Sequence, residues 1–451
     1  FASGAPRQLA DPTDARSNCG VGVVMDLSAG RSHDVVADGL ELLCNLEHRG
    51  TTGAEENTGD GAGIMLQRPD AFFDHVFESD LSDPYAVGSI FFPQDDAQRL
   101  SLIDTFESVL TEHDLVVREW RTVPTDNSDL GATALESEPA TLQPLVEPAT
   151  DMDTEAFDRA LYVARRAAEN AIEEDHPDIA EQFYVCSLDR KLVVYKGLLK
   201  SPQLPQYYPD LTDQAVASTF VLVHARFSTN TLGAWHLAHP YRHMIHNGEF
   251  NTIQGNINWM RARETDLETP AFESDIDQLK PIINDPEQSD TASVDNALEL
   301  LIKTGRDLPH ALRMLIPEAW RADDHMPEDR KAFYDYHASL VEPWDGPALV
   351  VGTDGDRIGA VLDRNGLRPC RYELTDDDRL IMASEAGALP TPADHVVERG
   401  RLKPGQLFLA DPEEGRVVPD DEVFDRLTDD RYEEWVVDEQ VPLSDVIDET
   451  E

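Results

Sequence analysis

The sequence has few basic residues, few cysteines and no long apolar run. Lys and Arg together number 37 against 88 Asp and Glu, which gives a formal net charge of −51. This balance argues strongly against nucleic acid as a partner, because neutralising phosphates requires clustered Lys and Arg. The longest apolar runs are strand-sized, far below the ~18 residues that a membrane helix needs. We therefore expect neither a nucleic-acid nor a membrane partner.

The four cysteines, at positions 19, 44, 186 and 370, show no C-x-x-C pair and no zinc-type His–Cys spacing. So few thiols in a long chain make a disulfide scaffold unexpected and favour a reducing, cytoplasmic location. Residues 1–18 lack the apolar core of a secretory signal. Excess acid with little lysine is typical of proteins from salt-rich cytoplasm, where salt screens the self-repulsion of the surface.

The apolar fraction of 41% is that of a globular chain, and 451 residues suffice for two or three domains or one large unit. Strand-like runs begin at Val21–Met25, a helix is predicted over about 34–47, and residues 253–330 look mostly helical. Residues 124–154 are acidic and aperiodic, which predicts a surface insertion. Strands return in the last third. The pattern favours an α+β fold of stacked, mainly antiparallel sheets covered by helices.

Cys19 is the most informative single residue. It precedes a predicted strand and lies in Ser17-Asn18-Cys19-Gly20-Val21-Gly22, where glycines allow another group to approach closely. A buried structural thiol is the alternative, and it is the interpretation that we favour for Cys44, Cys186 and Cys370.

Three further clusters can each be interpreted either as functional or as an ordinary structural feature. Arg226, after an apolar strand, could bind a carboxylate or form a surface ion pair. Asn247-Gly248 could supply an oxyanion hole or a hairpin turn. Asp290 lies in a segment that resembles a helix N-terminus.

Two other patterns are weaker candidates. The histidines at 236, 239, 243 and 246 could suggest a metal site, but they lack the spacing and the paired carboxylate that such a site needs. The glycines at 59, 61 and 63 precede a strand instead of opening a helix, so a nucleotide-binding loop is not expected. We predict no metal.

Taken together, these motifs resemble the class II glutamine amidotransferases, which have an N-terminal nucleophile fold. More narrowly, the chain is similar to the amidotransferase domain of the glutamate synthase large subunit over about 19–430. The motifs that carry this resemblance are Cys19–Gly22, His48–Gly50, Thr58–Gly63, His224–Thr231, His246–Asn256 with Trp259, Pro343–Pro347 and Leu362–Pro369.

The resemblance implies a four-layer αββα sandwich and the hydrolysis of L-glutamine through a Cys19 thioester. Residues 1–18 would be a leader whose removal frees the α-amine of Cys19 as a base. Asn247 and Gly248 would hold the oxyanion. The remaining roles implied are substrate binding by Arg226 (α-carboxylate), Asp290 (α-ammonium) and Thr229 with His239 (pocket shape).

The same resemblance implies a synthase domain or subunit that uses 2-oxoglutarate and carries FMN and an iron–sulfur cluster. Electrons would come from ferredoxin or from an NADPH-linked small subunit. No cofactor is expected within this chain, and residues 431–451 are interpreted as an acidic linker toward that portion. The alternatives are another class II amidotransferase, such as one that makes phosphoribosylamine, or a non-catalytic glutamine-sensing partner.

Overall fold

The computed structural model describes residues 19–50, 55, 57–226, 233–283 and 288–441. The predicted leader, residues 1–18, and Thr229 lie outside the described residues. The strands are β1 Gly20–Asp26, β2 Ala62–Gln67, β3 Ala86–Phe92, β4 Leu115–Thr122, β5 Ala140–Pro148, β6 Tyr184–Asp189, β7 Leu192–Gly197, β8 Phe220–Ala225, β9 Met244–Gly248, β10 Ala348–Thr353, β11 Ile358–Leu362, β12 Arg371–Thr375, β13 Arg379–Ala383, β14 Val396–Arg401, β15 Leu407–Asp411 and β16 Arg416–Val418. The helices are α1 His33–Asn45, α2 Asp70–Val76, α3 Asp96–Glu112, α4 Ala132–Glu136, α5 Thr154–Asp175, α6 Leu204–Tyr207, α7 Ile253–Glu264, α8 Asp290–Lys303, α9 Leu308–Leu315, α10 Glu328–His337, α11 Asp420–Leu427 and α12 Asp430–Glu439.

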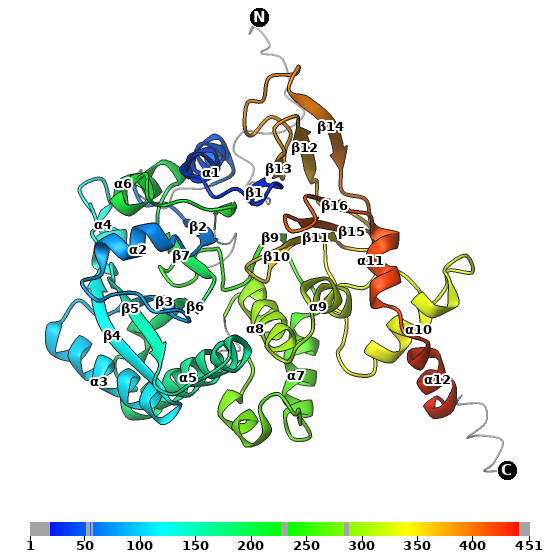
Figure 1. Cartoon of the computed structure of the whole chain (residues 1–451), viewed down its shortest axis with the longest axis horizontal. Helices are drawn as coiled ribbons and strands as arrows, with labels where there is room; N and C mark the ends of the chain where they lie inside the picture. The colour runs from blue at the N-terminus through cyan, green and yellow to red at the C-terminus, as the bar shows by residue number, and fades with distance from the viewer. Residues whose placement is uncertain (1–18, 51–54, 56, 227–232, 284–287, 442–451) are drawn as a thin grey trace, which may run out of the picture.

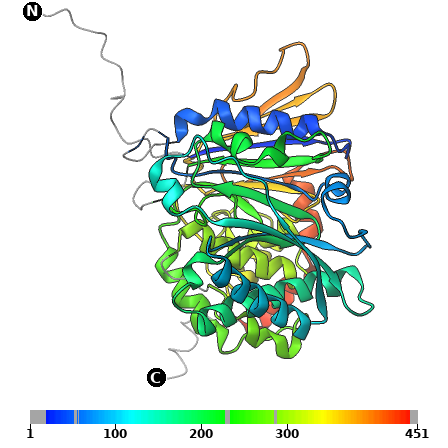
Figure 2. The ribbon, with the colours of Figure 1, turned by 90° about the vertical axis from the view of Figure 1, so that its left-hand side faces the viewer.

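Two stacked sheets form the centre of the molecule (Figure 1). The larger has the order β14-β12-β13-β1-β8-β2-β7 and the smaller the order β16-β15-β11-β10-β9, with antiparallel pairing throughout. Apolar side chains of both sheets share one core, to which Val23 and Val351 belong. Helix α1 covers the outer face of the larger sheet, and α8 and α9 cover that of the smaller, as Figure 2 shows in side view. The predicted α+β fold and its four αββα layers are confirmed.

Helix α1 forms where the sequence predicts it, because its ends and its buried face are both well defined. The side chain of Ser32 caps its first turn by accepting a hydrogen bond from the backbone N–H of Val35. Val36 and Leu43 are buried against the sheet. Because α1 packs on β1 and β8, it fixes the strand that Cys19 precedes.

A third sheet, with the order β4-β5-β3-β6, extends beside β7 and carries α3 and α5. Its strand β5 lies inside the segment 124–154, for which the sequence predicted a surface insertion. Leu145 and Val146 of β5 are fully buried between β3 and β4, so that prediction is wrong for this half of the segment. The strand is buried on both faces and so shows no alternation of polar and apolar residues.

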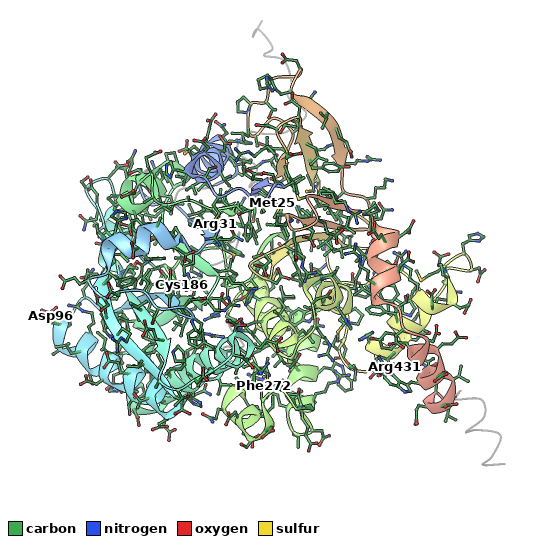
Figure 3. All side chains as sticks on the ribbon, viewed as in Figure 1. Met25, Arg31, Asp96, Cys186, Phe272 and Arg431 are labelled. Atoms are coloured by element: carbon green, nitrogen blue, oxygen red, sulfur yellow. The ribbon has the colours of Figure 1, made fainter. Side chains whose placement is uncertain are left out.

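The segment predicted as an acidic linker begins within a helix. Helix α12 packs on α10, where Tyr432 contacts His337 and Tyr336. Asp96 and Arg431 lie at the rim of the view in Figure 3, whereas Cys186 lies inside, fully buried. Among the described helices, none combines the length and the apolarity that crossing a bilayer requires.

Candidate active site

Three neighbouring strands of the larger sheet share one end of the sheet, where β1 and β2 begin and β8 ends. In the β1–β8 and β2–β8 ladders, Gly20 and Ala62 both lie opposite Ala225. Cys19 immediately precedes β1 and Arg226 immediately follows β8. The backbone N–H of Arg226 donates to the carbonyl of Gly61 at 2.7 Å. The sheet register therefore brings together three sequence motifs that are far apart in the chain.

Asn247 comes from the edge strand β9 of the smaller sheet and contacts Cys19 across the interface between the sheets. Its Oδ1 accepts a hydrogen bond of 3.0 Å from the backbone N–H of Cys19. Its Nδ2 is buried and has no hydrogen-bond partner among the described residues. The amide is thus oriented with its acceptor used and its donor available beside the thiol.

Gly248 ends β9 with a φ of +138°, and a Cβ there would lie 1.8 Å from the carbonyl oxygen of Pro347. The next residue, Glu249, donates its N–H to that same oxygen at 3.3 Å. Because hydrogen-bonded pairs alternate along an antiparallel ladder, the N–H of Gly248 does not bond to β10. Asn247-Gly248 is therefore part of an edge strand with free donors, and the hairpin-turn interpretation is wrong.

Asp290 is the first residue of α8, and the hydroxyl of Ser289 caps that helix. The Asp290 carboxylate accepts from the backbone N–H of Phe250 at 2.8 Å through Oδ2, and from that of Thr291 at 2.8 Å through Oδ1. It therefore ties the chain just beyond Asn247-Gly248 to the start of α8. Its half-buried charge lies close enough to Cys19 to act on the thiol.

Arg226 is buried and has an uncommon backbone conformation. Its φ is +92°, in the left-handed region that only glycine adopts without cost, and such strain clusters at functional sites. Its Nε lies 3.7 Å from Oδ2 of Asp60. Its Nη1 is buried without a hydrogen-bond partner among the described residues. A buried guanidinium with an unused donor is suited to bind a carboxylate.

The charges around Cys19 include two residues that sequence reasoning missed. Burial raises the pKa of the Cys19 thiol to about 12, the carboxylates of Asp60 and Asp290 add to this rise, and the guanidinium groups of Arg226 and Arg368 oppose it. Asp60 and Arg368 both lie in motifs that carry the family resemblance, Thr58–Gly63 and Leu362–Pro369. That membership was the only signal that could have identified them.

Three buried histidines, His224, His239 and His246, make contacts that help to join the two sheets. Nε2 of His224, on β8, donates to the carbonyl of His246, on β9, at 2.9 Å, so a second hydrogen bond joins the two sheets. The ring of His239 stacks on that of His224 at 4.1 Å, and burial lowers the pKa of His239 well below its ordinary value. Nδ1 of His246 bonds the hydroxyl of Thr291 at 3.0 Å. His224 and His246 thus link the two sheets next to Asn247, and His239 packs on His224.

Two more sequence motifs close the side of the site beside β9. The hydroxyl of Thr252 and the backbone of Asp345 exchange hydrogen bonds, and Trp344 packs edge-on against Phe250. Nε of Arg368 donates to the carbonyl of Pro347 at 3.1 Å. The segments 343–347 and 362–369 therefore hold Gly248 against β10.

Comparison with known proteins identifies the family of this chain. Residues 19–435 match the family model of the class II glutamine amidotransferases. The chain belongs to this enzyme family, since the match covers most of its length.

Within this family, the chain is similar to several named glutamate synthases. The chain is 43% identical over 431 residues to the glutamate synthase [NADPH] large chain of Bacillus subtilis, covering 94% of this chain and 28% of that one. It is 42% identical over 455 residues to glutamate synthase [NADH] of Schizosaccharomyces pombe, covering 98% and 21%. It is 40% identical over 438 residues to ferredoxin-dependent glutamate synthase 2 of Arabidopsis thaliana, covering 95% and 27%. The chain thus spans about a quarter of the length of these relatives.

A solved structure, described as the allosteric regulatory enzyme of purine biosynthesis, aligns with a TM-score of 0.38 at 13% identity. The alignment covers 88% of this chain and 47% of that one.

Proposed function

We propose that this chain hydrolyses L-glutamine to L-glutamate and ammonia, with Cys19 as the nucleophile. The observation that carries the proposal is the 3.0 Å hydrogen bond from the Cys19 N–H to Oδ1 of Asn247, which leaves Nδ2 of Asn247 free beside the thiol. An oxyanion hole needs a donor that is already oriented before charge develops. The buried, unpaired Nη1 of Arg226 and the half-buried carboxylate of Asp290 supply complementary charges for an amino acid.

In this proposal, residues 1–18 are removed and Cys19 becomes the first residue. Its α-amine then takes the thiol proton, and the thiolate attacks the side-chain amide carbon of glutamine. Asn247 and Gly248 hold the oxyanion, while Arg226 and Asp290 bind the α-carboxylate and the α-ammonium. The amine returns the proton to the departing nitrogen, which leaves as ammonia. Water then cleaves the thioester to glutamate and restores the thiol. Thr229 and His239 are assigned to shaping the pocket.

We further propose that the chain is the amidotransferase part of a glutamate synthase, with residues 19–430 forming that domain. The identity of about 40% to named glutamate synthases over nearly the whole chain supports this. The ammonia would pass to a synthase portion that reduces its adduct with 2-oxoglutarate, with electrons from ferredoxin or a pyridine nucleotide. FMN and an iron–sulfur cluster would lie on that portion. The described residues do not fit such a cluster, since no three of their Cys, His, Asp or Glu side chains are grouped to hold a metal ion.

Intact mass in concentrated salt, before and after a glutamine-analogue diazoketone, tests the glutaminase proposal. We expect a chain that begins at Cys19 and gains one adduct, because the diazoketone alkylates the thiolate with loss of N₂. A Cys19→Ser variant should gain none. A chain beginning at Cys19 that ignores the analogue would contradict the proposal.

We also propose that the protein is adapted to concentrated salt. The 37 basic residues can neutralise fewer than half of the 88 acidic ones, so most of the surface charge repels itself. Raising KCl from about 0.1 M to about 1 M shortens the screening length from about 10 Å to about 3 Å. The midpoint of thermal unfolding should therefore rise by several degrees over this range, as measured by calorimetry. A midpoint that stays level or falls would overturn this expectation.

A further inference from the structure

A pocket separate from the candidate active site lies at the far edge of the larger sheet, where β12–β14 project at the top of Figure 1. It has a volume of about 470 Å³ and is lined by β12, β13, β14 and the segment after β13. We call it the β12–β14 pocket. Its floor includes Ile381 and Ala383, and its wall includes Ala386 and Ala388, so much of its lining is small and apolar.

The pocket opens on the outer face of the sheet, opposite to the side on which Cys19 meets Asn247. Ala383 of β13 lies opposite Gly22 of β1, and partners directly opposite in a ladder share a face. That face of β1 is covered by α1, since a Cβ on Gly22 would meet the side chain of Leu42. The β12–β14 pocket is therefore an extension of the face under α1, and it is not part of the glutamine site.

Two arginines at this pocket face each other without a compensating acid. Arg371 of β12 lies directly opposite Arg401 of β14, and both line the pocket. Among the residues that the structure describes, neither guanidinium has an ion-pair or hydrogen-bond partner. Like charges directly opposite in a ladder destabilise a sheet. Such a pair is unexpected in a chain with more than twice as many acids as bases.

The two carboxylates that line the pocket are already paired with other bases. Glu373, two residues along β12 from Arg371, accepts from Nε of Arg399 at 2.8 Å. Glu385, on the wall, accepts from Arg49 and from Nε2 of His48, the latter at 2.6 Å. Arg371 and Arg401 therefore remain the uncompensated charges of the pocket.

We propose that the β12–β14 pocket binds a small organic anion, with a carboxylate or phosphate group held between Arg371 and Arg401 and a short carbon skeleton on the apolar floor. The guanidinium group binds either oxyanion through two parallel N–H donors. Bound anion would also remove the repulsion between the two arginines. Anion binding would therefore explain why two arginines that destabilise the empty pocket are present there.

Binding to the full chain tests this, with glutarate and inorganic phosphate as probes and KCl exchanged to keep ionic strength constant. We expect saturable binding of at least one probe by calorimetric titration, weakened at least about tenfold in the R371Q/R401Q double variant. Saturation by glutarate alone identifies a carboxylate, and saturation by phosphate alone identifies a phosphate. The R426Q/R431Q variant carries the same charge change, away from the pocket lining, and should bind as the parent does.

Without a probe, R371Q/R401Q should unfold at the same temperature as the parent or higher, because a repulsive pair is removed. This measurement also establishes that the variant is folded. Absence of saturable binding by both probes, or equal binding by the double variant, would overturn the proposal.

Discussion

A chain that still carries residues 1–18 should react with iodoacetamide at Cys19 roughly a thousandfold more slowly at pH 8 than an ordinary thiol does. Burial raises the pKa of this thiol to about 12. Only about one molecule in 10⁴ is then the reactive thiolate at pH 8, against about a quarter for a thiol of pKa about 8.5. The rate should keep rising with pH well above 9. Peptide mapping by mass spectrometry measures it site by site.

Removing residues 1–18 should increase this rate by a factor of hundreds or more, because a free α-amine of pKa about 7.7–8.0 would then lie on the same residue as the thiol. Cys44, which is half-buried, is the internal control, and its rate should be the same in both forms. Equal reactivity of Cys19 in both forms would show that the thiol is not activated by processing.

Replacing Asn247 by Ala should lower the turnover of glutamine by a factor of hundreds. The loss of one oxyanion donor costs about 3 kcal/mol of transition-state stabilisation. Asn247→Asp separates the two functions of this side chain. The aspartate keeps an acceptor for the Cys19 N–H but replaces the Nδ2 donor by a negative charge. Its turnover should be no higher than that of Asn247→Ala. Steady-state kinetics should show the effect mainly in kcat.

Asn170 of α5 provides the matched control, because its Nδ2 likewise donates to two backbone carbonyls, those of Gln278 and Lys280. Asn170→Ala should lose folding stability while its turnover stays within a few-fold of the parent. A fully active Asn247→Ala enzyme would remove Asn247 from the chemistry.

Through its resemblance to a known family, the sequence predicted the four layers and pointed to four of the residues that lie close together at the site. Cys19 precedes β1, Arg226 follows β8, Asn247 lies in β9 and Asp290 begins α8. Their motifs occur in the order that the family requires. Asp60 was missed because its charge matters only through its position beside Arg226 and Cys19. Such a juxtaposition depends on sheet register, which neither composition nor periodicity reveals.

Strand β5 was missed for a different reason. Pro144 lies in its middle, and proline in a central strand normally argues against that assignment. Here the β3–β5 ladder is interrupted between Val87–Leu145 and Ile90–Leu142, where Pro144 lies, while the β4–β5 ladder continues through the Trp120–Pro144 pair. Gly88 leaves room for the ring, since a Cβ there would lie 2.8 Å from Pro144 Cγ. The residue that makes room for Pro144 is thus on another strand, far away in the sequence, where a local sequence pattern cannot reveal it.

The candidate active site draws its two halves from different sheets. Cys19 and Arg226 flank strands β1 and β8 of the larger one. Asn247 lies in strand β9 of the smaller one, and Asp290 begins helix α8, which covers that sheet. A slip of one sheet over the other by a single residue, about 3.3 Å, would break the contact of Cys19 with Asn247 while leaving every strand intact. The turnover of glutamine would therefore report on the alignment of the two sheets. On heating, the turnover of glutamine should decrease at a lower temperature than the circular-dichroism signal of the strands does.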